Sequence, residues 1–528
     1  MSARPINLAD LIEVMADRIG DRPAFMTEDR EYSYAEVDER ATRLANHLVG
    51  AGIRPGDHVA VHATNRIEWV DAFYGALKAR AVPINVNYRY LHNELQHVYA
   101  NSESVMAIVA PEFVGAVKAI QDKVPTLKRL LILGGEYDAA LAAASQERRI
   151  QGRSSDDHYI IYTGGTTGLP KGVIWRQEDV MRGAMNGLRL NAPFDGIEQL
   201  AAEAAAAAGQ VRLFSVGPLM HGGSQWMLGS TAVAGGVYVL YTQAGFDAEQ
   251  VLDLVSRAKV NMMNILGDAV ARPLADAILA YPGRWDLSNL LAVANGAAPL
   301  SAAVRRDLRK ALPNCIHTDS YGSSESGMTG HRSDDPVLRS VPRFDLTPDV
   351  MIVDDQMRPC QVGQVGLVAR SGRVPLGYLN DPERTAATFK EINGKRWVIT
   401  GDTARVEDDG SYSLLGRGVM TINSGGEKIH PEEVEGVLME HPAVAEAGVV
   451  GTPHPRWGQQ VTAVVKLREG ASVSPGELQQ HCRTLIADYK VPKTVLLVDH
   501  LPRTPATKIE YPALYKMALE LVGQSQSA

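Results

Sequence analysis

Helix-like and strand-like segments alternate through the first 160 residues, and this alternation restricts the chain to a small set of folds. Apolar residues recur at helical spacing from Leu8 to Ile19, directly after Asn7, which can cap that helix. Ser33 and Glu36 have the spacing of a capping box before a second helix, which Gly50 can end. Short apolar runs typical of strands follow at 58–61, 105–109, 130–133 and 159–162. This order predicts an open, largely parallel sheet flanked by helices.

The pattern changes twice further along the chain. Residues 200–208 are mostly alanine and predict a helix. Between about 340 and 416, short β-like segments separated by glycine and proline favour a small barrel or a distorted sheet. The αβ pattern returns from about 420, with a helix predicted at 431–441 and a strand at 463–465. We therefore expect a domain boundary near 416–420, since a chain of 528 residues is too long for one ordinary core.

Composition excludes several classes of function. A net charge of −8 is unfavourable for a nucleic-acid partner, because phosphate backbones bind basic surfaces. The cysteines at 315, 360 and 482 are odd in number and far apart, so we expect neither a disulfide framework nor a zinc site. The first 20 residues lack the apolar block of a signal peptide, and no apolar run reaches the roughly 18 residues that span a bilayer. We expect a cytoplasmic protein without a transmembrane segment; the oligomeric state stays open, a homo-oligomer included.

A loop rich in glycine and threonine follows the apolar strand at 159–162. Glycines let the backbone approach a ligand closely, while hydroxyl groups, backbone N–H groups and a lysine ammonium suit a polyphosphate. The segment is not a Walker A loop, because Pro170 precedes the lysine and Gly172 follows it. An ordinary flexible turn is the alternative, and it explains the clustered Thr, Gly and Lys less well. The predicted phosphate-binding residues are Thr163, Gly164, Gly165, Thr166, Thr167, Gly168 and Lys171.

This loop resembles the signature of the acyl-adenylate-forming superfamily, which includes acyl-CoA synthetases, the adenylation domains of peptide synthetases and firefly luciferase. Further motifs resemble that family in its own order, over about residues 8 to 512. The resemblance implies an α/β protein whose N-terminal AMP-binding domain, residues 1–417, has two αβ sheet subdomains plus a small β-barrel. It also implies a small mobile α+β C-terminal domain, residues 418–528, that carries the catalytic lysine.

Two segments resemble the nucleotide-binding motifs of the family. The turn with Gly296, Ala297 and Ala298 has the small residues that let an adenine ring lie against the backbone. In the second segment, Tyr321 offers an aromatic face for adenine and Glu325 is a hard oxygen ligand for Mg²⁺. Asp319 can accept a hydrogen bond from the adenine amine, and Ser324 can donate one to the α-phosphate. The other predicted ATP/AMP-binding residues of this segment are Ser320, Gly322 and Ser323.

Two further positions resemble nucleotide contacts of the family. Asp402 matches the aspartate that holds both ribose hydroxyls, and a carboxylate can accept two hydrogen bonds from a vicinal diol. Arg417 matches a second nucleotide contact. Together with the motifs above, they imply ATP and Mg²⁺ as co-substrate and cofactor.

The catalytic residues implied by the resemblance are His221, Glu325 and Lys508. His221 lies in a segment that resembles the one beside the substrate carboxylate, whereas a core histidine is the plainer alternative. Lys508 matches the lysine that bridges the attacking carboxylate and the α-phosphate. Two positions depart from the family pattern. Thr507 stands where a glycine usually precedes the lysine. Val419 stands where a polar hinge residue is common.

Coenzyme A and the acid are the other implied ligands. The segment with Gly425, Gly426, Glu427 and Lys428 resembles the one presented to the pantetheine arm of coenzyme A. The predicted acyl pocket is lined by Met220, Trp226, Gly267 and Asp268, although packing alone would explain the apolar members equally well. Trp175, the stretch 267–273 and the stretch 416–419 resemble a bacterial subgroup of fatty-acid and steroid-side-chain CoA ligases. We therefore expect an AMP-forming acyl-CoA synthetase acting on a hydrophobic medium- or long-chain, or steroidal, carboxylate.

Other activities fit parts of this pattern. An aryl-CoA ligase or a stand-alone amino-acid adenylating enzyme would share the nucleotide motifs. A peptide-synthetase module would need a carrier protein, and no carrier motif fits into the few residues after 512. A luciferase-like oxygenase is compatible with the same fold. A nucleotide-binding regulator with an inactive site fits the intact Lys171, Glu325, Asp402 and Lys508 poorly.

Overall fold

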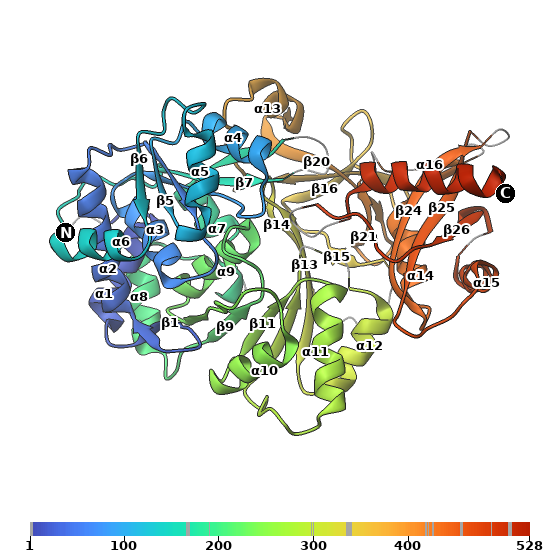
Figure 1. Ribbon diagram of the computed structural model, residues 1–528, viewed down its shortest axis with the longest axis horizontal. Helices are drawn as coiled ribbons and strands as arrows, with labels where there is room; N and C mark the ends of the chain where they lie inside the picture. The colour runs from blue at the N-terminus through green and yellow to red at the C-terminus, as the bar shows by residue number, and fades with distance from the viewer. Residues whose placement is uncertain are drawn as a thin grey trace.

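A computed structural model gives the fold of the protein. It describes residues 4–164, 169–189, 191–296, 298, 300–333, 341–417, 420, 422–424, 427–454, 458–486, 488–504 and 509–527. At 333, 417, 423, 427, 428, 458 and 524–527 it describes the backbone alone. The described residues form four β-sheets with helices packed around them (Figure 1).

The first sheet contains most of the strands predicted in the N-terminal region. Its strand order is β18-β8-β7-β4-β3-β5-β6, and the strands from β7 to β6 in this order run parallel. The strands are β3 (His58–His62), β4 (Val82–Asn85), β5 (Met106–Val109), β6 (Arg129–Ile132), β7 (His158–Thr163), β8 (Lys171–Arg176) and β18 (Gly377–Tyr378). The predicted strand runs are thus confirmed as β3, β5, β6 and β7.

A second αβ sheet completes the two-sheet arrangement that the resemblance implied. Its order is β14-β13-β12-β11-β9-β10-β1-β2, parallel except at β14 and β2. The strands are β1 (Pro23–Met26), β2 (Glu31–Ser33), β9 (Arg212–Ser215), β10 (Val237–Val239), β11 (Met262–Ile265), β12 (Ala292–Asn295), β13 (Ile316–Ser323) and β14 (Gly327–Ser333).

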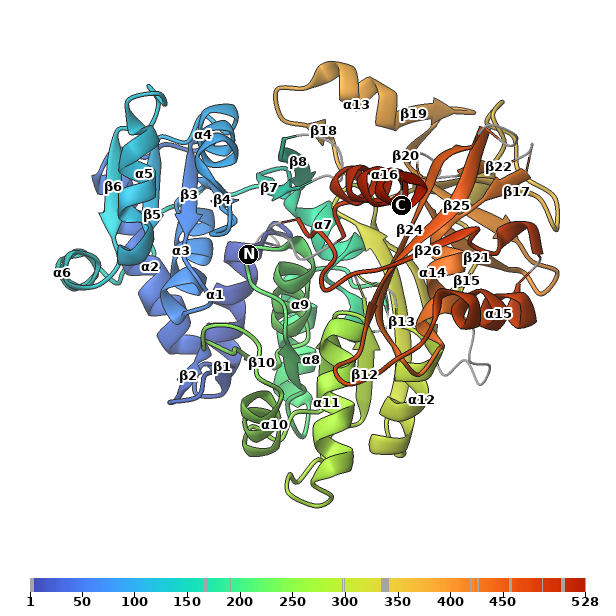
Figure 2. The same cartoon turned by 45° about the vertical axis from the view of Figure 1, so that its right-hand side comes forward.

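Helices cover these two sheets and fill the space between them (Figures 1 and 2). They are α1 (Leu8–Ile19), α2 (Tyr34–Gly50), α3 (Ile67–Lys78), α4 (His92–Asn101), α5 (Val114–Gln121), α6 (Gly135–Ala143), α7 (Gln177–Gly183), α8 (Ile197–Ala206), α9 (Gly222–Val233), α10 (Ala248–Arg257), α11 (Asp268–Ala280) and α12 (Ala302–Ala311). The alanine-rich segment is α8, as its composition predicts.

The two predicted N-terminal caps form, one of them only in part. The Asn7 side chain accepts a hydrogen bond from the Ala9 backbone N–H at 3.0 Å and caps α1. The Ser33 hydroxyl likewise accepts from the Glu36 N–H at 3.2 Å. The Glu36 carboxylate, however, pairs with Arg30. The reciprocal half of the predicted capping box is therefore replaced by an ion pair.

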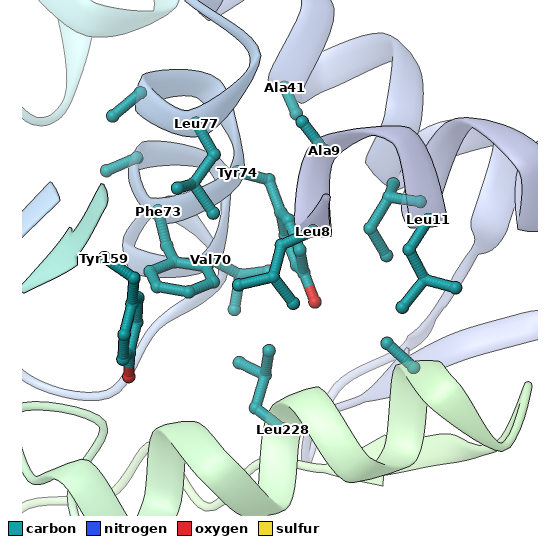
Figure 3. Close-up of a cluster of buried hydrophobic side chains, with 14 of the residues drawn as sticks. Leu8, Ala9, Leu11, Ala41, Val70, Phe73, Tyr74, Leu77, Tyr159 and Leu228 are labelled. Atoms are coloured by element: carbon teal, nitrogen blue, oxygen red, sulfur yellow. The ribbon is translucent and has the colours of Figure 1, made fainter. Parts of the chain in front are cut away.

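The main core lies where α1 packs between the helices of both sheets. Figure 3 shows side chains of α1, α3, β7 and α9 pointing into one cluster, among them Leu8, Tyr74, Tyr159 and Leu228. All four are at most 1% exposed. Burying a leucine side chain contributes on the order of 2 kcal/mol, so this cluster binds the two sheets into one body.

The region between about 340 and 416 forms the small antiparallel unit that the sequence predicts. Its strands are β15 (Arg343–Asp345), β16 (Val350–Val353), β17 (Val365–Ser371), β19 (Phe389–Ile392), β20 (Lys395–Val406) and β21 (Ser411–Arg417), and α13 (Pro382–Thr388) precedes β19. Within the described residues the strand order runs β15-β21-β20-β17-β16, with β19 beside β20. This path does not close into a complete barrel in the part of the chain described.

The C-terminal unit is a fourth sheet covered by helices. Its strands are β22 (Ile422–Ser424), β23 (Glu427–Ile429), β24 (Val444–His454), β25 (Gly458–Leu467) and β26 (Thr494–Leu497), and its helices are α14 (Pro431–Met439), α15 (Pro475–Leu485) and α16 (Tyr511–Ser527). The predicted helix at 431–441 is α14, and the predicted strand at 463–465 lies in β25. The unit lies at the opposite end of the molecule from the N terminus in Figure 1, and α14 contacts α12 and β21. No described helix has both the length and the apolar composition to cross a bilayer.

Candidate active site

The predicted phosphate loop joins two strands that pair with each other. β7 and β8 run antiparallel, and Thr163 at the end of β7 lies opposite Lys171 at the start of β8. These two residues form the base of the loop. Gly165, Thr166, Thr167 and Gly168 lie outside the described residues, whereas Gly164 is described beside Thr163. The loop leaves the carboxyl end of β7, and the carboxyl ends of strands are where open α/β sheets bind their ligands.

Two side chains that the sequence did not single out support this loop from the region of α4. The His97 Nε2 lies 2.9 Å from the Pro170 carbonyl oxygen. The Tyr90 hydroxyl lies 3.7 Å from the position that a Cβ would take on Gly164. Burial raises the pKa of Tyr90, so its hydroxyl stays protonated. His97 therefore contacts the end of the loop at Pro170, and Tyr90 lies near its start at Gly164.

Glu325 and Lys171 come together beside the loop. The Lys171 Nζ lies 3.6 Å from the Glu325 Oε1, and Glu325 is only 8% exposed. The Tyr378 hydroxyl donates to the same Oε1 at 2.9 Å. Trp175 of β8 donates from Nε1 to the Ser324 carbonyl oxygen at 3.0 Å, which ties this segment to the phosphate-loop strand. The predicted cation and the predicted carboxylate thus share one site.

The residues at this site fit a magnesium ion that is bound jointly with a nucleotide. Glu325 supplies a hard carboxylate oxygen next to the phosphate loop. No group of three or more His, Cys, Asp or Glu side chains that could hold a metal occurs among the described residues. Mg²⁺ typically binds through one or two carboxylates, substrate phosphates and water. Phosphate oxygens would therefore have to complete its coordination here.

Tyr321 and Asp402 meet at the junction of the second and third sheets. The Tyr321 hydroxyl and the Thr400 hydroxyl both donate to the Asp402 Oδ2, each at 2.6 Å. Burial and the adjacent Asp402 carboxylate raise the pKa of Tyr321, so the phenol remains a donor. In the pairing of β20 with β21, Asp402 lies opposite Arg417, whose side chain is outside the described atoms. The predicted adenine and ribose contacts are thus neighbours.

Asp319 is held by two donors, Asn295 at the end of β12 and Arg305 of α12. Its carboxylate accepts from the Arg305 Nη2 at 2.8 and 3.0 Å and from the Asn295 Nδ2 at 3.1 Å. A carboxylate offers about four acceptor positions, so a further donor such as an adenine amine can still be accommodated. The role of Asp319 in binding the adenine amine therefore stays a prediction, and its carboxylate is oriented by Arg305 and Asn295.

Short turns shape the backbone on both sides of Asp319. The Ala298 N–H donates to the Gly296 carbonyl at 2.8 Å, and Ala297 lies outside the described residues. A Cβ on Gly322 would clash with the Gly327 carbonyl, so only glycine fits there. The Ser320 hydroxyl lies 3.4 Å from the Nδ1 of His331 in β14, and the Ser323 hydroxyl lies 3.0 Å from the Ser326 hydroxyl in the following turn.

His221 stands at the start of α9, next to the phosphate-loop strand. A Cβ on the adjacent Gly222 would lie 2.9 Å from Ile161 of β7 and 3.6 Å from the Ser324 hydroxyl. Asn85, at the end of β4, connects the same two segments. Its side chain donates to the Tyr162 and Met220 carbonyls at 2.9 and 2.6 Å and accepts from the Tyr162 N–H at 2.8 Å. The histidine is thereby brought near the predicted phosphate site.

The predicted acyl-pocket residues fall into two groups. Met220 and Trp226 are buried, and Trp226 packs edge to face on Trp175 with ring centroids 6.3 Å apart. Gly267 has a left-handed φ of 61° and donates to the Asn295 Oδ1 at 2.9 Å. The Asp268 Oδ1 accepts from the Ser301 N–H at 2.7 Å, and burial raises the pKa of this carboxyl group. Asp268 thus joins α11 to α12, and its pocket role stays a prediction.

Parts of the predicted C-terminal site lie outside the described residues, namely Val419, Gly425, Gly426, Thr507 and Lys508; so do the side chains of Glu427 and Lys428. Their flanks are described. Ser424 of β22 pairs with Glu427 of β23. Arg503 pairs with Ile509, and the Glu510 N–H donates to the Pro502 carbonyl at 2.9 Å. The described residues on either side of Lys508 therefore lie close together.

Comparison with known proteins assigns the family. Residues 12–379 match the AMP-binding enzymes, and residues 433–508 match the AMP-binding enzyme C-terminal domain. The chain belongs to the AMP-binding enzyme family. It is 43% identical to a 3-oxocholest-4-en-26-oate–CoA ligase of Rhodococcus rhodochrous, over 96% of this chain and 95% of that one. It is 40% identical to a medium/long-chain-fatty-acid–CoA/3-oxocholest-4-en-26-oate–CoA ligase of Mycolicibacterium smegmatis, with the same coverage.

Solved structures of AMP-binding enzymes share the fold along the whole chain. The anthranilate CoA ligase AuaEII in complex with anthranoyl-AMP superposes with a TM-score of 0.84, at 25% identity over 97% of both chains. ATP-bound MatB from Rhodopseudomonas palustris gives 0.82, at 26% identity over 97% of this chain and 99% of that one. With the curated relatives, these findings identify the protein as an acid–thiol ligase of the AMP-forming acyl-CoA synthetase type.

The structure adds supporting residues to this AMP-binding enzyme that its motifs did not reveal. Tyr378 contacts Glu325, Asn85 joins the phosphate-loop strand to the histidine segment, and His97 supports the loop. Each comes from an element far from its partner in the sequence. Only the pairing of distant strands and helices brings them together, and no local pattern carries that information.

Proposed function

We propose that this AMP-forming acyl-CoA synthetase activates a hydrophobic medium- or long-chain fatty acid or a steroid-side-chain acid with Mg·ATP. The observation that carries the nucleotide part is the meeting of Lys171 with the buried Glu325, 3.6 Å apart, beside the phosphate loop. A cation for phosphates and a carboxylate for their metal ion are the two charged groups that ATP activation needs.

In the first half-reaction, a carboxylate oxygen of the acid attacks the α-phosphorus of ATP. The new P–O bond forms as the bond to pyrophosphate breaks, which gives the acyl-adenylate and free pyrophosphate. Lys171 and the phosphate-loop donors would hold the leaving phosphates, and Lys508 would neutralise charge between the attacking carboxylate and the α-phosphate. His221 would orient the acid, because it is the N-cap of α9 and the next residue, Gly222, lies beside the Ser324 hydroxyl.

Glu325 would hold Mg²⁺ together with the nucleotide phosphates. The ion would supply electrostatic neutralisation of the charge that develops on the phosphate oxygens. Tyr321 would stack on the adenine ring, and Asp402 would accept from the ribose hydroxyls. Their mutual hydrogen bond of 2.6 Å supports a joined adenosine site.

In the second half-reaction, the coenzyme A sulfur attacks the acyl carbonyl carbon. The thioester forms, AMP leaves with the bridging oxygen, and the thiol proton passes to solvent. This step needs no protein nucleophile, so the three free cysteines have no required part in it. We expect the C-terminal domain, residues 418–528, to rotate relative to residues 1–417, withdraw Lys508 and present the segment 425–428 to the pantetheine arm.

An apolar acid is supported by two independent observations. The predicted pocket wall beside His221 contains the buried Met220 and Trp226, backed by Trp175. Curated relatives at 40–43% identity are named for fatty and steroidal acids. A low-dielectric wall disfavours a charged or strongly polar acyl group unless a partner compensates it.

A coenzyme A-dependent AMP-release assay over fatty, steroidal, aromatic and amino acids tests the substrate class. We expect kcat/KM for a medium- or long-chain or steroidal acid to exceed that for benzoate or an amino acid by about 100-fold or more, since each buried methylene adds about 0.8 kcal/mol. Preference for aromatic acids would identify an aryl-CoA ligase. ATP–pyrophosphate exchange with amino acids alone would identify an amino-acid adenylating enzyme.

The three cysteines are free thiols, as is usual in a reducing compartment. This observation supports the expectation that the enzyme works in the cytoplasm.

A further inference from the structure

Two side chains from distant parts of the chain meet at Glu325. The Tyr378 hydroxyl donates to the Glu325 Oε1 at 2.9 Å, and the Lys171 Nζ lies 3.6 Å from the same oxygen. The ammonium also lies 4.8 Å from the centre of the Tyr378 ring. A single tyrosine therefore contacts both the predicted metal ligand and the predicted phosphate ligand. It does so through different parts of its side chain, the hydroxyl and the ring face.

The backbone around Tyr378 is fixed by strand pairing. β18 is an edge strand beside β8, where Tyr378 lies opposite Val173. Hydrogen bonds flank it on both sides, from the Leu376 N–H to the Ile174 carbonyl at 2.7 Å and from the Leu379 N–H to the Gly172 carbonyl at 2.8 Å. Because β8 begins with Lys171, this pairing holds Tyr378 at a constant distance from the phosphate loop.

The ring of Tyr378 is fixed as well. It packs edge to face on Phe389, with centroids 5.9 Å apart. Its backbone N–H donates to the Thr385 hydroxyl at 2.9 Å. A phenol hydroxyl is a donor and a carboxylate is an acceptor, so the hydrogen bond runs from Tyr378 to Glu325.

We propose that Tyr378 is a positioning residue that orients Glu325 for Mg²⁺ and keeps Lys171 directed at the nucleotide phosphates. The contacts from Tyr378 and Lys171 are both made to the Oε1 of Glu325, and neither is made to its Oε2. When Mg·ATP binds, Lys171 exchanges Glu325 for phosphate oxygens, while the hydrogen bond from Tyr378 keeps the carboxylate in place. The inference rests on the proposed role of Glu325 as a metal ligand.

The test measures metal binding directly, without turnover. Mn²⁺ stands in for Mg²⁺ and is followed by electron paramagnetic resonance in the presence of a non-hydrolysable ATP analogue. The Tyr378→Phe variant keeps the ring that packs on Phe389 and removes only the hydroxyl. Because a hydrogen bond to a charged group is lost, we expect the Kd for Mn²⁺ to rise about tenfold. The KM for the acid should change less than about twofold, since the hydroxyl that is removed donates to the predicted metal ligand.

Tyr137→Phe is the matched control. Tyr137 also donates to a buried carboxylate, the Asp71 Oδ2 at 3.0 Å, but it joins α6 to α3. We expect this variant to lower the melting temperature and to leave the Mn²⁺ affinity unchanged. A second variant, Tyr378→Leu, removes the ring as well. It should additionally weaken binding of the ATP analogue in the absence of any divalent ion, because Lys171 loses the ring face that it lies over.

The outcomes separate the inference from the function on which it rests. If Tyr378→Phe binds Mn²⁺ as tightly as the unchanged protein, the positioning role is wrong. If its melting temperature falls like that of Tyr137→Phe while the Mn²⁺ affinity stays, Tyr378 is structural only and the inference fails. If the unchanged protein binds no Mn²⁺ with the nucleotide analogue, the proposed function itself fails at Glu325.

Discussion

Lys508 is the residue on which the first half-reaction is proposed to depend. Its substitution by alanine should reduce ATP–pyrophosphate exchange on the order of 100- to 1000-fold, because the charge between the carboxylate and the α-phosphate is then not neutralised. Thioester formation from supplied acyl-AMP and coenzyme A should change less than about threefold, since that step follows the loss of pyrophosphate. Quench-flow measurement of both half-reactions tests this expectation.

Lys516 provides the control for that experiment. It is an exposed lysine on α16, eight positions after Lys508. Its substitution by alanine should leave both half-reactions unchanged. An equal loss of both half-reactions in the Lys508→Ala variant would contradict the role assigned to that lysine.

A site residue could be predicted when one short sequence segment contained both the backbone conformation that the site needs and the chemical group that binds the ligand. Lys171 and Glu325 belong to such segments, and the structure brings them within 3.6 Å. Tyr378 was not predicted, because its contact with Glu325 depends on β18 pairing with β8 about 200 residues earlier in the chain. Asn85 was missed for the same reason, since its partners Tyr162 and Met220 lie on separate segments.

At the scale of elements, the caps show what local sequence can and cannot predict. Asn7 starts α1 as expected, because a side chain can reach a backbone N–H two residues away without help from the rest of the fold. The Glu36 half of the second cap failed, because Arg30 on the preceding turn binds that carboxylate. A rule based on residue spacing within a motif cannot predict an ion pair with a residue outside that motif.

Helix α14 carries a half-buried acid with a measurable pH effect. Glu435 accepts from the Val449 N–H at 2.7 Å and from the Tyr511 hydroxyl at 2.8 Å. Burial, with Glu432 as the next contribution, raises its pKa from 4.5 to about 8. An acid whose folded pKa lies above its unfolded value lowers the free energy of unfolding as the pH rises from about 4.5 to about 8. Glu435 is therefore protonated in the folded protein below about pH 8.

Substitution of Glu435 by glutamine should consequently stabilise the protein at pH 8 and have little effect at pH 5. Glutamine keeps an acceptor for the Val449 N–H and the Tyr511 hydroxyl but carries no charge. The expected gain at pH 8 is on the order of 1–3 kcal/mol, measured as the free energy of unfolding in urea.

Glu433→Gln is the control on the same helix. Glu433 pairs with Lys490 at 2.6 Å, so its neutralisation should give no gain at pH 8. A Glu435→Gln variant that loses stability equally at pH 5 and pH 8 would show that the carboxyl group is not protonated in the folded protein.

At the scale of the whole molecule, the alternation of helices and strands predicted the class of fold but not the division into separate sheets. Local periodicity identified β3, β5, β6 and β7, whereas the order of strands depends on contacts between distant segments. The predicted boundary between residues 417 and 418 remains a prediction. The end of β21 at Arg417 and the start of β22 at Ile422 are compatible with it. Gly416 has a φ of 92°, a backbone conformation that favours glycine, and it lies beside the Glu432 carboxylate of α14 where the two units meet.

We propose that the acid is activated as an acyl-adenylate before coenzyme A attacks it. Transfer of oxygen from the acid to the nucleotide distinguishes this route from others. A preferred acid labelled with ¹⁸O in both carboxyl oxygens is turned over with ATP and coenzyme A, and the nucleotide product is analysed by mass spectrometry. We expect AMP to gain one ¹⁸O atom for each acyl-CoA formed. Unlabelled AMP, or ADP formed together with ¹⁸O-labelled phosphate, would show that no acyl-adenylate is formed.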